Sequence, residues 1–149
     1  MTAASPSEEF AFGVSVAPVT TVDELVVLSL RLGYLGTGNV YVPIRFAVAP
    51  LGDVRLRVLE ARPGEDPTRE LPFGKRVRLA PVRASDFIAV EPGEVIAAGY
   101  PLSEGYRLER ARTYTINAEF VCPEPPEELR GYRVATGRFA APETRLTVR

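Results

Sequence analysis

Residues 86–94 read Asp-Phe-Ile-Ala-Val-Glu-Pro-Gly-Glu, an apolar run that ends in a turn signature. Proline holds φ at about −65° at the second position of a turn, and glycine accepts positive φ at the third. Pro92 and Gly93 occupy these two positions, so we predict a strand over 87–90 and a tight turn over 91–94. A second apolar run starts at Val95, and we expect Pro101 to end the strand that it forms.

Alternation of apolar with small or polar residues extends this β pattern toward the amino terminus. Apolar residues stand at every second position over 10–16 and again over 26–32, the clearest run in the chain. A period of two is typical of a strand with one buried face. Residues 33–39 hold three glycines and an asparagine, which favours a hairpin turn. Residues 40–48 then predict an extended stretch, in which Pro43 indicates a sheet edge or a bulge.

The carboxy-terminal half continues in the same way. In 54–61, Val54, Leu56, Val58 and, after a break, Ala61 form the apolar side, and polar residues that include Glu60 lie between them. Further strands are expected over 76–79, 113–121, 132–134 and 146–148, with polar or proline-rich loops at 62–69 and 122–131. About eight short strands without a convincing helix predict an all-β, immunoglobulin-like antiparallel β-sandwich with Greek-key connections. We expect one domain over 10–149, preceded by a flexible tail, 1–9.

The charge balance and hydropathy of the chain limit the classes of partner that it is expected to bind. Eighteen basic and nineteen acidic residues leave a net charge of −1, which disfavours nucleic acid as a partner because such proteins carry a basic surplus. There is no run of 18 apolar residues, so no membrane span is predicted. The first residues lack the basic and apolar regions of a signal peptide, which fits either a cytoplasmic protein or a secreted domain whose leader has been removed.

The inventory of reactive side chains disfavours an enzyme. The chain has no histidine, one cysteine, Cys122, and one lysine, Lys75, so neither a histidine-based triad nor a Ser–Lys pair with its motif is recognisable. A glycosidase would need two facing carboxylates, for which Glu91, Glu94 and Glu104 are candidates, although turn glutamates are more often solvated. We therefore assign no catalytic, cofactor or metal-binding residue. The aspartates that calcium would need are scattered singly at 23, 53, 66 and 86.

Several other features have a structural and a binding interpretation. Cys122 is expected to be a small residue at a strand end, and Tyr114 is expected to form a tyrosine corner, in which its hydroxyl bonds to the backbone a few residues upstream. Glycines at 33, 36 and 38 precede no helix, so they indicate a turn rather than a phosphate cradle. Arginines at 76, 78 and 83 suggest either a solvated strand face or a stripe that binds a partner. The acidic, proline-rich loop 122–131 is either a spacer or a recognition element.

Residues 86–94, the segment from Leu102 to Leu108 and the run 113–116 together resemble the Ig-like accessory domain that precedes the catalytic domain in deuterolysin-type and peptidyl-lysine metallopeptidases. The closing run, Gly137-Arg138-Phe139 followed by 144–148, is similar to the last strand of that family. Arg112 stands where the family has a glycine, and the zinc motif of the catalytic domain is absent. The resemblance implies a sandwich domain with a relation to proteolysis, and similar turns also occur in small bacterial protease-inhibitor domains of Ig-like fold.

These observations predict a non-enzymatic module for protein interaction or assembly, whose partner is a peptidase, an assembly subunit or a second copy of the chain. The alternative is a peptidase inhibitor or a peptidase accessory or pro-domain, for which the loops 62–69 and 122–131 are the candidate binding elements. An assembly module should leave apolar residues exposed on a strand face. The sequence assigns no individual binding residue.

Overall fold

The computed structural model describes residues 9–66 and 69–149. Its strands are β1 (Phe10–Ser15), β2 (Val19–Thr20), β3 (Val27–Tyr34), β4 (Val40–Pro43), β5 (Val54–Ala61), β6 (Arg69–Glu70), β7 (Phe87–Val90), β8 (Val95–Pro101), β9 (Arg112–Val121), β10 (Arg138–Ala140) and β11 (Thr144–Val148). Three 3₁₀ turns accompany them: η1 (Ala84–Asp86), η2 (Leu102–Glu104) and η3 (Glu127–Leu129).

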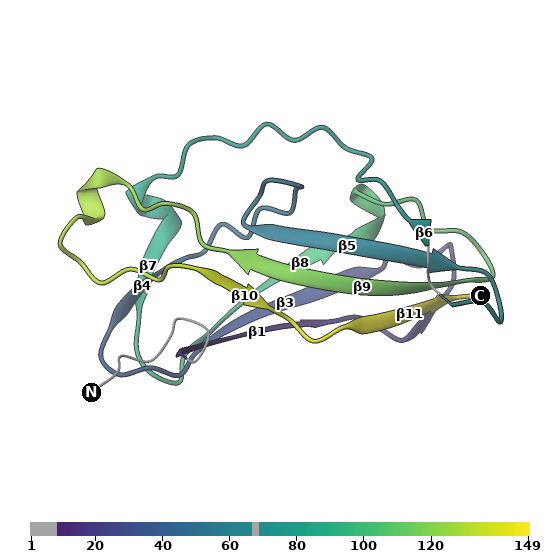
Figure 1. Ribbon diagram of the computed structural model, residues 1–149, viewed down its shortest axis with the longest axis horizontal. Helices are drawn as coiled ribbons and strands as arrows, with labels where there is room; N and C mark the ends of the chain where they lie inside the picture. Colours follow the sequence, from purple (N-terminus) through teal and green to yellow (C-terminus); the bar gives the residue numbers. More distant parts are fainter. Residues whose placement is uncertain (1–8, 67–68) are drawn as a thin grey trace.

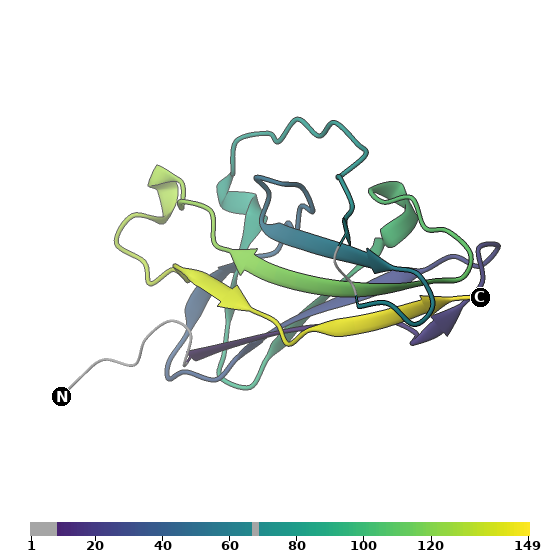
Figure 2. The same cartoon turned by 45° about the vertical axis from the view of Figure 1, so that its right-hand side comes forward.

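These strands form two main sheets that face each other, with a short strand pair at one end (Figures 1 and 2). The large sheet has the order β2-β11-β9-β5-β6, and β10 also pairs with β9. The three-stranded sheet has the order β1-β3-β8, and β4 pairs with β7. Every pair is antiparallel except β11 with β2. The predicted all-β sandwich is therefore confirmed.

The alternation in the sequence places the core between the two main sheets. In β3, Leu28, Leu30 and Leu32 are at most 2% exposed, whereas Val27 and Arg31 point outward. Long apolar side chains of β9 and β11, among them Phe120 and Leu146, meet the leucines from the other sheet. Burying each such side chain stabilises the fold by about 1.5–3 kcal/mol, so the alternation determines which face of each strand is inside.

The turn predicted over 91–94 forms in the structure. Gly93 adopts φ +91°, and its amide donates to the carbonyl of Tyr34 at the end of β3. The backbone amide of Glu94 donates to the carbonyl of Glu91, and the carboxylate of Glu94 accepts from the amide of Glu91. The turn thus connects β7 of the short pair to β8 of the three-stranded sheet.

Two predicted strands are absent from the structure. Residues 76–79 form no strand: the pairing of the chain with β5 ends near Pro72, which has no amide hydrogen, and no other strand of the described part pairs with the segment that follows. Residues 132–134 contribute only an isolated bridge between Val134 and Tyr41. The strand predicted over 40–48 is shorter than expected, since β4 ends at Pro43 and Phe46 has φ +49°.

Two other predictions fall partly outside the described residues. The tail 1–9 was expected to be flexible; residues 1–8 lie outside the described part, whereas Glu9 is bonded. Its carbonyl accepts from the amide of Leu35, and its carboxylate pairs with Arg133. Of the loop 62–69, residues 67 and 68 lie outside the described part, and Arg62–Asp66 form an exposed turn after β5.

Candidate functional site

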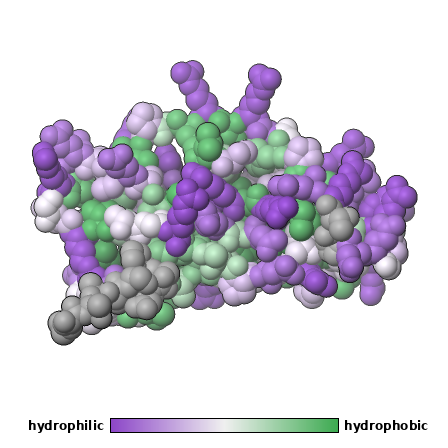
Figure 3. All heavy atoms as spheres, in the orientation of Figure 1, coloured by the Kyte–Doolittle hydropathy of each residue, from purple (hydrophilic) through white to green (hydrophobic). Residues whose placement is uncertain are grey.

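The outer face of the large sheet is polar. Arg55 lies opposite Glu119 and Arg57 opposite Asn117 across β5 and β9, and Arg138 pairs with Glu119 at 3.2 Å. Figure 3 shows hydrophilic side chains on this side of the molecule, with hydrophobic ones between them. Long charged side chains that pair with one another on an exposed sheet face are ordinary, so this surface requires no functional explanation.

The outer face of the three-stranded sheet is different, because it is built from small residues. Cross-strand partners here are Ala11 with Gly33, Ser15 with Ser29, and Ser29 with Gly99. We call this surface the small-residue face; its members are Ala11, Gly13, Ser15, Val27, Ser29, Arg31, Gly33, Val95, Ala97 and Gly99. Val27 and Val95 are 44% and 49% exposed, and Arg31 is the one charged member. The face is therefore flat, and its largest apolar side chains lie open to solvent.

The fold does not require the glycines of this face. Gly13, Gly33 and Gly99 are not among the glycines with positive φ. A Cβ atom at Gly13 would meet nothing within 4 Å, and at Gly33 the nearest atom would be 3.8 Å away. At Gly99 it would lie 3.2 Å from a methyl group of Val27, the one close contact of the three. Glycine inside a strand weakens it and often marks a place where another backbone or a ligand approaches closely.

The small-residue face continues into the free edge of β8. The amide of Leu102 donates to Val26 and the amide of Tyr34 donates to Glu94, so by alternation the backbone groups of residues 96, 98 and 100 point toward β3. The amides and carbonyls of Val95, Ala97 and Gly99 point away from the sheet. Within the described residues they have no hydrogen-bond partner. We call these groups the β8 edge; all three residues are exposed.

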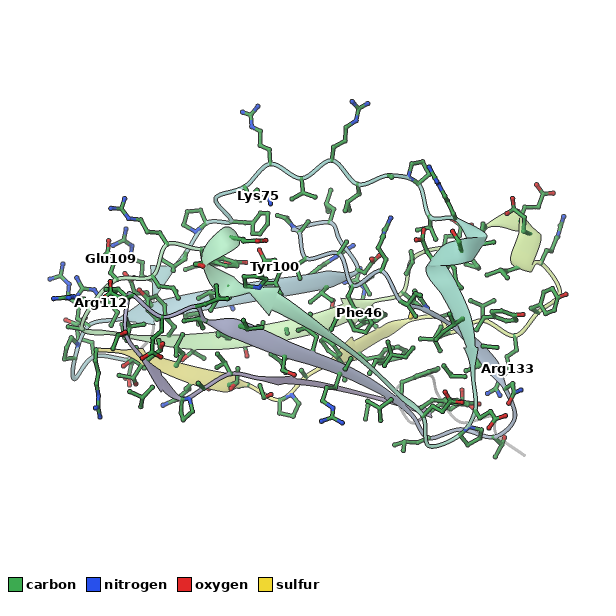
Figure 4. The ribbon with its side chains drawn as sticks, turned by 180° about the vertical axis from the view of Figure 1, so that it is seen from behind. Phe46, Lys75, Tyr100, Glu109, Arg112 and Arg133 are labelled. Carbon is green, nitrogen blue, oxygen red and sulfur yellow. The ribbon has the colours of Figure 1, made fainter. Side chains whose placement is uncertain are left out.

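An exposed segment crosses the open side of the sandwich. Residues 71–83, which we call the strap, arch over β5 without forming a strand (Figure 1). The amides of Leu71 and Gly74 donate to the carbonyls of Val58 and Gly105, and Arg45 donates to the carbonyl of Ala80. Between these contacts the side chains of residues 75–78 are exposed, and Figure 4 shows Lys75 above the end of β8 that carries Tyr100.

The arginines predicted to form a strand stripe lie on the strap. Arg76 and Arg78 are exposed and make no ion pair within the described residues. Arg83 instead caps η1, with its amide 2.8 Å from the Asp86 carboxylate. The three arginines therefore do not line one face of a sheet, and only Arg76 and Arg78 extend into solvent from the same part of the strap.

The acidic loop 122–131 borders a hollow at one end of the sandwich. The hollow measures about 540 Å³ and is lined by Glu124, Pro125, Pro126 and Tyr132, among others. Tyr132 is 60% exposed and packs edge-on against Tyr41, with 5.3 Å between ring centroids. The hollow is open to solvent, and its lining mixes apolar residues with the charged residues Glu124, Glu127 and Arg130.

Two buried polar clusters have structural explanations. Tyr114 forms the expected corner, since its hydroxyl accepts from the backbone amide of Glu109 at 2.7 Å. It also donates to the carboxylate of Glu60, which is only 7% exposed. Glu60 was expected on the polar side of its strand; instead it continues the inward series of Val54 and Val58. Arg45 donates two hydrogen bonds, at 2.8 and 2.9 Å, to Asp53, which is 2% exposed.

The remaining predicted reactive groups do not come together. Glu91 and Glu94 lie at one end of β8 and Glu104 lies beyond the other end, so the three carboxylates do not converge. The described part of the chain contains no group of three or more acidic or cysteine side chains that could hold a metal ion. Cys122 is half-buried, and burial with the nearby Asp53 raises its pKa to about 12, which leaves it a weak nucleophile.

Comparisons with known proteins identify no family for this chain. No protein-family model matches it, and no curated protein matches it. In the residues that the structure describes, no helix has the length and apolar character needed to cross a membrane. The similarity to metallopeptidase accessory domains therefore stays a prediction, as does an immunoglobulin-like relationship.

Proposed function

We propose that this chain is a non-enzymatic protein-interaction module that binds a partner through the small-residue face and the adjoining β8 edge. The observation that carries the proposal is the presence of Gly13 and Gly33 in neighbouring strands, where neither backbone conformation nor packing requires glycine. Each costs about 0.5–1 kcal/mol of stability relative to alanine. The contrast with the long, paired side chains on the other sheet supports a role for this side alone.

The chemistry of the face suits a flat protein partner. Stacked sheets pack about 10 Å apart, and small side chains allow a partner backbone to approach more closely than that. Val27 and Val95 supply apolar contacts at opposite ends of the face. Arg31 lies between them, opposite Ala97, and arginine is enriched at protein interfaces because it can bind a carboxylate through two hydrogen bonds. A partner with an acidic residue near the centre of a flat apolar surface fits best.

The test is site-specific photo-crosslinking. Benzoylphenylalanine is introduced at Ser29, on the small-residue face, and separately at Asn117, on the outer face of the large sheet; both positions are half-buried. The proposal predicts a discrete adduct from position 29 in the native lysate and none from 117. An excess of unlabelled wild-type chain should compete the adduct away, whereas an excess of Gly13→Lys should not. Equal labelling from both positions, or none from 29, would contradict the proposal.

One observation favours the alternative, a peptidase inhibitor. The strap is extended, exposed and tethered at both ends, which is the form in which a loop enters a peptidase active site, and it carries basic residues at 75, 76 and 78. Such a loop would fit peptidases that cleave after lysine or arginine. Inhibition of trypsin that is lost in an Arg76→Ala, Arg78→Ala variant would move this alternative to first place. Rapid cleavage of the strap without inhibition would exclude it.

A further inference from the structure

We propose that the β8 edge pairs with the β8 edge of a second copy of this chain, antiparallel and with its two-fold axis at Ala97. This inference rests on the proposed function, because it names the partner for the β8 edge; pairing in the plane of the sheet leaves the small-residue face open to a different protein. The observations that support it are the free backbone groups of β8, not the small side chains of the small-residue face.

The free groups are self-complementary. Along β8, every second residue directs its amide and carbonyl away from β3; these residues are Val95, Ala97 and Gly99. The set is symmetric about its middle residue, Ala97. Two antiparallel copies centred on Ala97 place Ala97 opposite Ala97 and Val95 opposite Gly99. Residues in such positions exchange both of their hydrogen bonds, so the pairing would form about six across the interface. The two three-stranded sheets would then join into one continuous sheet.

The residues at the two ends of the β8 edge determine the register of the proposed pairing. Pro101 occupies the next outward position and has no amide hydrogen, so the ladder cannot extend past Gly99 on that side. On the other side the turn at Glu91–Glu94 diverts the chain toward β7. If the two-fold axis moved toward either end of β8, at least one outward backbone group would lie opposite the turn or opposite Pro101 and would have no partner. The register centred on Ala97 is the one that uses all three residues.

This edge also lacks the features that prevent such pairing. Natural edge strands carry charged residues, are very short or are covered by other elements. The large sheet ends in β2 and β6, each two residues long. The edge residues of β1, Phe10 and Phe12, are buried, and β1 lies alongside β10 and β11 in Figures 1 and 2. β8 is seven residues long and contains no charged residue.

A partner approaching β8 would also cover half-exposed side chains. Ile96, Ala98 and Tyr100 face the core side of the sheet but are only partly buried, because no strand lies beyond them. Tyr100 also has a hydroxyl without a hydrogen-bond partner, near the end of β8 shown in Figure 4. An added strand would exclude water from this row, which strengthens the hydrogen bonds of the edge.

The test compares two matched substitutions. Ala97→Lys places two like charges opposite each other at the axis, whereas Ala140→Lys places the same charge at an exposed strand position of the large sheet, outside the small-residue face and the β8 edge. Light scattering after size-exclusion chromatography, at concentrations up to about 1 mM, should show a dimer for the wild type and for Ala140→Lys. For Ala97→Lys the dissociation constant should rise at least about tenfold.

Disulfide cross-linking tests the register of the proposed pairing. In a Cys122→Ser background, Ala97→Cys should form a disulfide-linked dimer under mild oxidation, because paired residues in this position lie about 5.5 Å apart between Cα atoms. Ala140→Cys, at an exposed position of the large sheet, should form no disulfide-linked dimer. A wild-type chain that stays monomeric throughout, or a dimer unaffected by Ala97→Lys, would overturn the inference. If the chain is monomeric while position 29 still cross-links specifically to another protein, the proposed function stands and only the identity of the partner is wrong.

Discussion

The hydroxyl of Tyr114 connects three parts of the sandwich. It accepts a hydrogen bond from the amide of Glu109, in the connection that leads from η2 to β9, and donates one to Glu60 on β5. Tyr114 itself is fully buried and belongs to the core. A single side chain thus fixes the crossover between the sheets and provides the hydrogen bond that a buried carboxylate needs.

Replacing Tyr114 by phenylalanine should therefore be costly. The substitution leaves a buried carboxylate without this donor and the Glu109 amide without its acceptor, so we expect the free energy of unfolding to fall by about 2–3 kcal/mol. Urea unfolding followed by circular dichroism measures the loss. Tyr132→Phe, at a 60% exposed position, is the control and should change stability by less than about 0.5 kcal/mol. Equal losses for the two variants would show that the corner contributes little.

Stability should fall at alkaline pH because of two buried tyrosines and the half-buried Cys122. Burial raises the pKa of Tyr106 to about 12 and that of Cys122 to about 12, and it also raises the pKa of Tyr114. In the unfolded chain these groups lose their protons at about pH 8.5–10, so above that range the folded chain holds more protons than the unfolded chain. The free energy of unfolding must then decrease as pH rises from about 9 to about 12.

Urea midpoints measured between pH 7 and pH 11 test this dependence. Tyr106→Phe and Cys122→Ala should each make the alkaline decrease shallower, since each removes one group that stays protonated only in the folded chain. A midpoint that rises or stays constant above about pH 9 would contradict the assigned burial of these groups.

At the scale of elements, the sequence predicts most where structure is local. The strand at Val27–Tyr34 and the turn at Pro92-Gly93 depend on residues within a few positions, and both form as predicted. The strand expected at 76–79 fails because a strand also needs an unpaired neighbour. Val54 and Val58 of β5 already bond elsewhere, to Ala47, Ala49 and Leu71. Which strands pair with each other depends on the topology of the whole fold. The alternation of apolar and polar residues along one segment gives no information about that topology.

The candidate site was only partly predictable for the same reason. The sequence led us to expect exposed apolar residues on a strand face, but it could not say which strand ends a sheet. The small residues at every second position of 11–15 and 95–99 were the available signal. Glu60 shows the complementary error: its spacing from Val54 and Val58 placed it inside, while its charge suggested outside.

The strap should be the first site of proteolysis in the folded chain. A protease needs an exposed segment that can extend through its active site, and the strap is exposed, forms no strand and has tethers only near its ends. Brief treatment with trypsin should cut after Lys75, Arg76 or Arg78 before Arg55 or Arg57 in β5. Mass spectrometry of the first products identifies the site. Initial cleavage inside β5 would mean that the large sheet opens more easily than the strap.

At the scale of the whole molecule, the two sides of the sandwich differ in what they present to solvent. The large sheet shows charged side chains that pair with one another, such as Arg138 with Glu119. The three-stranded sheet shows glycine, alanine and serine beside an unpaired strand edge without charge. This asymmetry, rather than any reactive group, is the basis for proposing a protein-interaction module.

Amide hydrogen exchange at the β8 edge tests most directly whether this side of the sandwich binds a second copy of the chain. NMR resolves the amides of Val95, Ala97 and Gly99, which point outward, from those of Ile96, Ala98 and Tyr100, which bond to β3. The three outward amides should exchange rapidly in dilute solution and become protected as the chain concentration rises, while the inward three stay protected throughout. Outward amides that exchange equally fast at every concentration would contradict pairing at this edge.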